Sequence, residues 1–185
     1  MAQNRGKQFE DVVREALERV PGVSVDRLHD QTNGYLGSSN ICDFIVYKRP
    51  FELYLECKSV HGNTFSIHGT DEKHKYGNIT NKQWEGLLEK SKIKGVVAGV
   101  LIWWVDKDVT RFVTIQSLQR IREHEFNSIR YDADVVQGEY LYTLKGKKKR
   151  VFFDYDMEDF LGYLKHTDIL RCLNQLQQEA HNERV

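Results

Sequence analysis

The sequence has few cysteines, no long apolar run and no excess of charge of either sign. Its three cysteines are Cys42, Cys57 and Cys172. They lack the spacing of a zinc site, and two of them fall in apolar runs, so we expect buried free thiols rather than a metal cluster or a disulfide framework. No apolar run is long enough to span a bilayer, and the N-terminal residues resemble no signal peptide. We therefore expect a cytoplasmic protein without a membrane segment.

The balance of charge says little about partners. Lys and Arg together number 27, as do Asp and Glu, and the pI is near 7.1. Binding of nucleic acid would therefore depend on local clusters of charge. A chain of 185 residues can bury a core without covalent cross-links. We predict one domain over residues 1–185, with a core over about 4–115 and a C-terminal hairpin and helices over about 116–178.

Two apolar runs near the middle of the N-terminal half predict a β-hairpin. Ile41–Tyr47 and Phe51–Cys57 are rich in strand-forming residues, and Lys48–Pro50 between them is typical of a turn. Side chains alternate between the two faces of a strand. One face of the second strand is therefore apolar, and the other presents Glu56 and Lys58 together.

Closing this hairpin would place Asp43 beside Glu56. Two carboxylates and an ammonium group would then meet at one end of a sheet. Mg²⁺ prefers one or two carboxylates together with water and phosphate oxygens, so this group suits a divalent cation. The alternative is a solvated Glu-x-Lys pair on a surface strand, which is common.

A helix is predicted before the hairpin. Apolar residues recur at steps of three and four, and Pro21–Gly22 would end the helix, which we place over residues 3–20. Glu10 falls at the edge of the apolar stripe, where its carboxylate could lean over the sheet. The alternative is a solvated helix glutamate.

Further strands and helices are predicted along the rest of the chain. We expect strands over 23–28, 95–105 and 111–115, the second of them buried, and polar loops over 30–40 and 59–81. Thr80 or Asn81 would cap a helix with Gln83 in its first turn. We also predict helical turns over 117–122, a hairpin between 139–144 and 151–155, and helices over 157–165 and 168–178.

Basic residues gather at two places. One lies around the start of the helix after Thr80, and the other is the segment Lys145–Arg150 between the two C-terminal strands. The second could be a solvated turn or a phosphate contact. The candidate DNA contacts are Arg5, Lys7, Lys73, Lys75, Lys82, Lys147, Lys148, Lys149 and Arg150.

The order of elements and the spacing of Asp43 and Glu56-x-Lys58 resemble the core of the PD-(D/E)XK nucleases, the restriction-endonuclease-like fold. Within that superfamily the chain looks most similar to the RecU-type Holliday junction resolvases, over about residues 4–115. The residues that carry this likeness are Asn4-Arg5-Gly6, Phe9-Glu10, Asp43, Glu56-x-Lys58, Thr64-Phe65 and Gln83. Cys42 stands where the superfamily motif has proline, and the segment Asp26–Asn40 is short where RecU-type enzymes have a stalk.

The resemblance implies a fold, a site and an activity. The fold would be α/β, with a central mixed sheet flanked by helices. Asp43, Glu56 and Glu10 would hold Mg²⁺ or Mn²⁺, and Lys58 and Gln83 would complete the catalytic set. The activity would be paired incision of four-way DNA junctions by a homodimer. Two alternatives remain open: another DNA endonuclease of restriction or repair type, and a non-catalytic DNA-binding module on the same fold.

Overall fold

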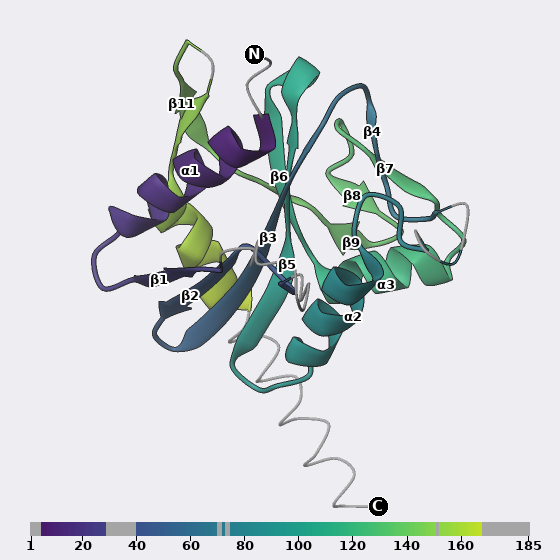
Figure 1. Cartoon of the computed structure of the whole chain (residues 1–185), viewed down its shortest axis with the longest axis horizontal. Coiled ribbons are helices and arrows are strands. Elements are labelled where there is room, and N and C mark those ends of the chain that lie inside the picture. The colour runs from purple at the N-terminus through teal and green to yellow at the C-terminus, as the bar shows by residue number, and fades with distance from the viewer. Residues whose placement is uncertain (1–4, 29–39, 70–71, 73–74, 151, 168–185) are drawn as a thin grey trace, which may run out of the picture.

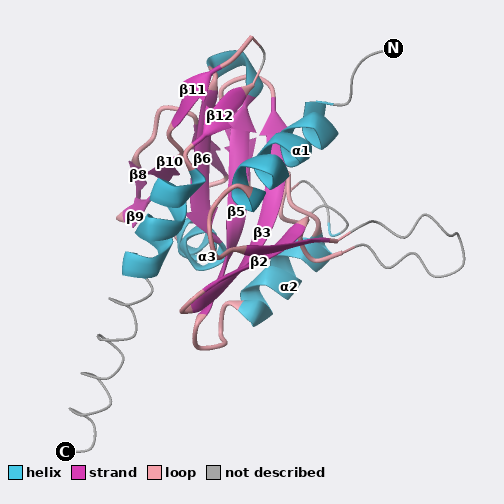
Figure 2. Ribbon diagram, turned by 90° about the vertical axis from the view of Figure 1, so that its left-hand side faces the viewer, coloured by secondary structure: helices cyan, strands magenta, loops and turns pink. Residues whose placement is uncertain are grey.

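A six-stranded mixed sheet forms the centre of the protein, with helices on both faces (Figures 1 and 2). The computed structural model describes residues 5–28, 40–69, 72, 75–150 and 152–167. The predicted fold class is thus confirmed. In spatial order the strands are β1 (Ser24–Arg27), β2 (Phe44–Lys48), β3 (Phe51–Val60), β5 (Val96–Trp104), β6 (Val109–Thr114) and β10 (Tyr142–Thr143).

Each face of the sheet has its own apolar core. On one face α1 (Arg5–Glu18) and the helix over residues 157–167 pack on the sheet; their buried residues include Phe9 and Phe160. On the other face α2 (Asn81–Lys90) and α3 (Ile115–Glu123) bury residues that include Trp84 and Leu118. All nine residues of β5 are buried between the two cores, as the unbroken apolar run predicted.

The hairpin of β2 and β3 forms as predicted. The strands are antiparallel, with Phe44 opposite Leu55 and Lys48 opposite Phe51, so that Arg49 and Pro50 make the turn. On β3, Leu53 and Leu55 enter the core beneath α1. Tyr54 enters the core beneath α2, so the even-numbered positions of β3 face that helix.

The helix α2 begins at a complete capping box. The hydroxyl of Thr80 accepts a hydrogen bond from the backbone N–H of Gln83, and the side chain of Gln83 accepts one from the backbone N–H of Thr80. This arrangement satisfies two backbone donors that a helix N-terminus otherwise leaves unpaired. It also fixes the position of the Gln83 side chain at the start of the helix.

The segment predicted as a long loop after β3 contains a short strand. β4 (Thr64–Ser66) pairs antiparallel with β7 (Ser128–Arg130), more than sixty residues further along the chain. Phe65 at its centre is fully buried. A three-residue strand whose partner is so distant has no local pattern that would reveal it.

The predicted C-terminal hairpin has the wrong first strand. Its strands are β11 (Gly146–Lys148) and β12 (Phe153–Tyr155), so part of the expected basic turn is itself a strand. The segment 139–144 instead divides between β9 (Glu139–Tyr140), which pairs with β8 (Val135–Val136), and β10, which joins the central sheet. The side chain of Leu141, between β9 and β10, is fully buried.

The predicted helix over 168–178 and most of the polar loop over 30–40 lie outside the described residues, as does Cys172. Cys42 and Cys57 are buried free thiols. Within the described ranges, no helix is long and apolar enough to cross a bilayer.

Candidate active site

The site is built on the face of β3 that looks toward α2. The alternation of the strand points Glu56 and Lys58 to this face, and only 2% of the surface of Glu56 is exposed. Asp43 directly precedes β2, and continuing the register of the hairpin places it opposite Glu56. An oxygen of the Asp43 carboxylate accepts a hydrogen bond of 2.7 Å from the backbone N–H of Cys57. Hairpin pairing therefore brings the two carboxylates together.

Lys58 and Gln83 hold one oxygen of the Glu56 carboxylate. Lys58 Nζ lies 2.8 Å from Glu56 Oε1, and the amide of Gln83 donates a 2.6 Å hydrogen bond to the same oxygen. Gln83 Oε1 in turn accepts a 3.1 Å hydrogen bond from Lys58 Nζ. Because Gln83 also belongs to the capping box of α2, the start of that helix and the end of β3 are fixed to one another.

The other oxygen of Glu56 has no hydrogen-bond partner among the described residues, although it is buried. Burial and, to a smaller extent, the negative charge of Asp43 raise the pKa of Glu56 to about 8, against the opposing effect of Lys58. The charge of Lys58 therefore does not offset the effects of burial and of Asp43 on Glu56. A buried, unpartnered carboxylate oxygen beside a second carboxylate is a good fit for a hard divalent cation.

Glu10 lies close to this group but is held by another residue. Its charge contributes to the raised pKa of Glu56. Its carboxylate oxygen Oε2, however, accepts a 2.7 Å hydrogen bond from Arg27 at the end of β1. Among the residues that the structure describes, no group of three or more His, Cys, Asp or Glu side chains is placed to hold a metal ion. The structure thus gathers Asp43, Glu56, Lys58 and Gln83, while Glu10 remains a predicted ligand.

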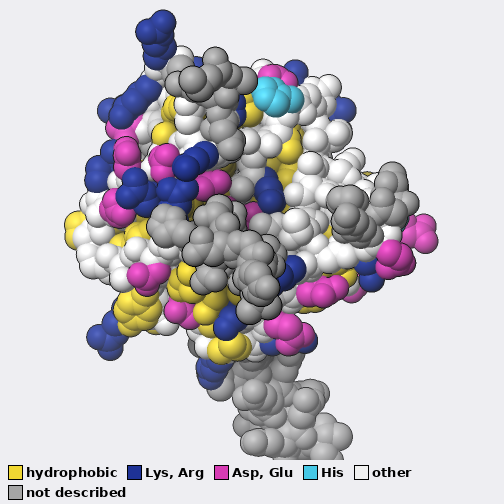
Figure 3. Space-filling model, in the orientation of Figure 1, with side chains coloured by type: hydrophobic (Ala, Val, Ile, Leu, Met, Phe, Trp, Pro, Cys, Tyr) yellow, Lys and Arg dark blue, Asp and Glu magenta, His cyan; other side chains and the backbone are white. Residues whose placement is uncertain are grey.

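The candidate DNA contacts divide between two parts of the molecule. Arg5 and Lys7 are exposed at the start of α1, and Lys82 is exposed in the first turn of α2. The exposed Lys75 has its Nζ atom 5.5 Å from the ring centroid of Tyr76. Lys73 lies outside the described residues. On the face shown in Figure 3, Lys and Arg side chains lie among Asp and Glu over α1, so this surface is mixed in charge.

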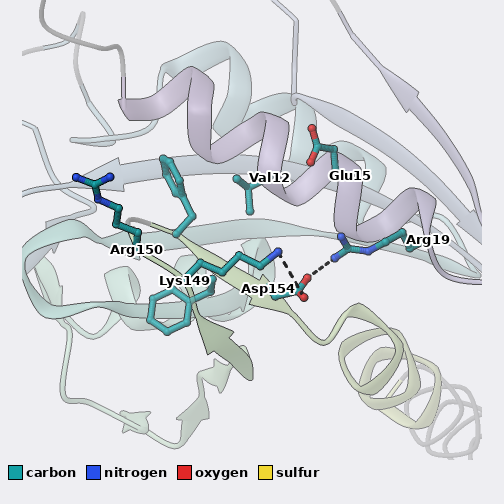
Figure 4. A pocket seen from close by; sticks show the side chains of 8 residues that line it. Val12, Glu15, Arg19, Lys149, Arg150 and Asp154 are labelled. Carbon is teal, nitrogen blue, oxygen red and sulfur yellow. Dashed lines mark hydrogen bonds and ion pairs between the residues drawn. The ribbon is translucent and has the colours of Figure 1, made fainter.

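Acidic neighbours compensate much of the charge of the hairpin β11–β12. Lys148 pairs with Asp108, and Lys149 lies 3.6 Å from Asp154. Asp154 also forms a 2.5 Å ion pair with Arg19 at the end of α1, which links the hairpin to that helix (Figure 4). Lys147 and Arg150 are exposed to solvent, where a phosphate could reach them.

Sequence reasoning missed two groups at this site. One is the backbone N–H of Cys57, which positions Asp43, and the other is Arg27, which binds Glu10. Arg27 becomes visible only through the strand register, which sets it opposite Phe44, the residue after Asp43. The order of residues along the chain carries no signal for this pairing.

No protein-family model and no curated protein sequence matches the chain. Among solved structures, it is similar to the Holliday junction resolvase Hjc of the archaeal hyperthermophile Archaeoglobus fulgidus. The two share 16% sequence identity over 61% of this chain and 77% of that chain, with a TM-score of 0.39. This likeness is too distant to assign an activity, which depends on the geometry of the site.

Glu56→Gln is expected to stabilise the metal-free protein, and more so at alkaline pH. The carboxyl group ionises near pH 4.5 in the unfolded chain but only near pH 8 in the folded protein. The stability of the wild type therefore falls as the pH rises through this window, and the full penalty is present above it. Glutamine cannot ionise and escapes the penalty.

Thermal unfolding in EDTA at about pH 5 and about pH 9 measures this effect. The gain of the variant over the wild type should be below about 1 kcal/mol at the lower pH and on the order of a few kcal/mol at the higher pH. If Glu56→Gln gains equally in stability at both pH values, or loses stability at the higher pH, the charge of Glu56 is compensated in the folded protein.

Proposed function

We propose that this protein is a divalent-metal-dependent DNA endonuclease and that Asp43 and Glu56 hold its cation. The observation that carries this proposal is the buried Glu56 Oε2 atom, which has no partner among the described residues and lies beside a second carboxylate. A fold has no structural need to bury the carboxylate of Glu56 next to that of Asp43, because buried charge that is not fully compensated opposes folding. Cation binding would turn this unfavourable arrangement into a functional one.

The residues around the carboxylates have separate tasks. A bound Mg²⁺ or Mn²⁺ would polarise the scissile phosphate and lower the pKa of a water molecule. Lys58 places a positive charge 2.8 Å from Glu56, where it can orient the attacking water or stabilise negative charge that develops on the phosphate. Gln83 holds both Lys58 and Glu56 in place from the rigid start of α2.

The DNA structure that the endonuclease cuts is a separate question. The sequence resemblance to RecU-type enzymes favours four-way junctions, cut in pairs by a homodimer, because a junction has near two-fold symmetry. An endonuclease acting on other DNA would use the same site. A non-catalytic DNA-binding module would not need a carboxylate pair, which repels a polyanion.

Incubation with labelled four-way junctions, forks and linear duplexes, in Mg²⁺ and in EDTA, tests the proposal. We expect cleavage in Mg²⁺ and none in EDTA. Intact DNA under all conditions, Mn²⁺ included, would leave the binding module as the function. Cleavage that persists in EDTA would reject a metal-dependent mechanism.

A further inference from the structure

Arg27 joins two acidic residues of α1 to the sheet. Its Nη2 atom donates a 2.7 Å hydrogen bond to Glu10, and its Nη1 atom donates one of 2.7 Å to Asp11. Only 17% of the Arg27 side chain and 24% of the Glu10 side chain are exposed. Charged hydrogen bonds of this length in a partly buried setting are strong, so the guanidinium holds Glu10 firmly.

The position of Arg27 relates this clamp to the candidate cation site. Arg27 pairs with Phe44 across β1 and β2, and the next residue, Leu28, donates its backbone N–H to the carbonyl oxygen of Asp43 at 2.8 Å. The clamp thus lies next to the strand end that presents Asp43. Glu10 is the third carboxylate near this point. Its carboxylate already forms an ion pair with the guanidinium of Arg27, which would compete with a bound metal ion for it.

We propose that Arg27 competes with the divalent cation for Glu10 and gives up Glu10 when a DNA phosphate takes the guanidinium. This inference rests on the proposed function and adds a form of regulation to it. A phosphate accepts the same two-pronged hydrogen bonds from arginine that carboxylates do. Glu10 would then be free to complete the cation site, so cation and DNA would each strengthen the binding of the other.

The simpler possibility is that Arg27 only fastens α1 to the sheet. Removing the guanidinium would then loosen the packing around the site and weaken cation binding or leave it unchanged. Competition makes the opposite prediction, because an uncompensated Glu10 attracts a cation. The sign of the change in cation affinity therefore separates the two roles.

The test is calorimetric titration of the DNA-free protein with Ca²⁺, a hard ion that binds oxygen ligands. Arg27→Gln should bind Ca²⁺ at least about five-fold more tightly than the wild type, the lower end of typical coupling between sites. The same substitution in a Glu10→Gln background should give no gain. Arg27→Lys keeps the charge but lacks the planar fork of donors of arginine, so its gain should fall between the two, and it replaces Arg27→Gln if that variant does not fold.

Arg14→Gln is the matched control. Arg14 lies on α1 and pairs with Asp11 at 4.0 Å and Glu18 at 3.5 Å, so its loss removes a nearby positive charge without touching Glu10. It should not change Ca²⁺ affinity by more than about two-fold. A gain as large as that of Arg27→Gln would reject the clamp in favour of a general field effect.

A second titration in the presence of a short duplex tests the role of phosphate, with the integrity of the DNA checked on a gel. Duplex should raise the Ca²⁺ affinity of the wild type and of Arg14→Gln more than that of Arg27→Gln. Equal gains would overturn the release of Glu10 by DNA.

If Glu56→Gln abolishes Ca²⁺ binding but Arg27→Gln does not strengthen it, the inference fails and the proposed function stands. If no variant binds Ca²⁺, both fail.

Discussion

Asp43→Asn and Glu56→Gln are each expected to abolish DNA cleavage while metal-free binding of DNA survives or improves. Each carboxylate would hold the cation, so neutralising either removes the Lewis acid that activates water. The negative charge of Asp43 also repels phosphate, and Glu56 adds to that repulsion above about pH 8, where it is ionised without metal, so neither substitution should weaken DNA binding. Activity should therefore fall while affinity does not, which separates loss of function from loss of fold.

The measurement pairs a cleavage assay in Mg²⁺ with a binding assay in EDTA. Glu52→Gln is a suitable control, because Glu52 lies near the start of β3, where it pairs with Tyr47, and is distant along the strand from Glu56. This control should cleave and bind like the wild type. Near-normal cleavage by both site variants would reject the assigned site. Loss of cleavage and of DNA binding, together with loss of the cooperative thermal unfolding transition, would indicate misfolding.

Local patterns explain how much of this site could be predicted from the sequence. Alternation along β3 fixes which residues share a face with Glu56, and the charged turn at Arg49–Pro50 fixes where the hairpin reverses. Together these two signals place Asp43 beside Glu56 without knowledge of the rest of the fold. The capping signal at Thr80 likewise places Gln83 at the start of α2.

The failures arise where pairing connects distant or weakly patterned segments. The run over 139–144 has strand-forming residues, but burial of Leu141 splits it between two partners. The basic residues Lys147 and Lys148 have low strand propensity, yet they form β11 because Phe153 and Tyr155 supply the opposite strand. The contact of Arg27 with Glu10 also depends on register between elements, which a single sequence does not encode locally.

If the protein resolves junctions, it should be dimeric at working concentration and bind a four-way junction at least ~10-fold more tightly than linear duplex, about 1.4 kcal/mol. A resolvase must place two active sites on strands of like polarity, whereas a nicking or repair nuclease can act through one site. The preference must come from the shape of the junction. Most contacts to DNA fall on phosphates, which position a protein without carrying sequence information.

Sedimentation measures whether the protein is a dimer, and competition binding in EDTA measures its preference for junctions. Sequencing gels of junctions labelled on each strand show where it cuts. Paired cuts placed symmetrically across the crossover should release nicked duplexes. The short segment Asp26–Asn40 makes this test decisive, because a protein that does not reach the junction centre would bind its arms no better than free duplex. Equal binding and cutting of junction and linear DNA by a monomer would reject junction resolution and leave the nuclease site at Asp43 and Glu56 intact.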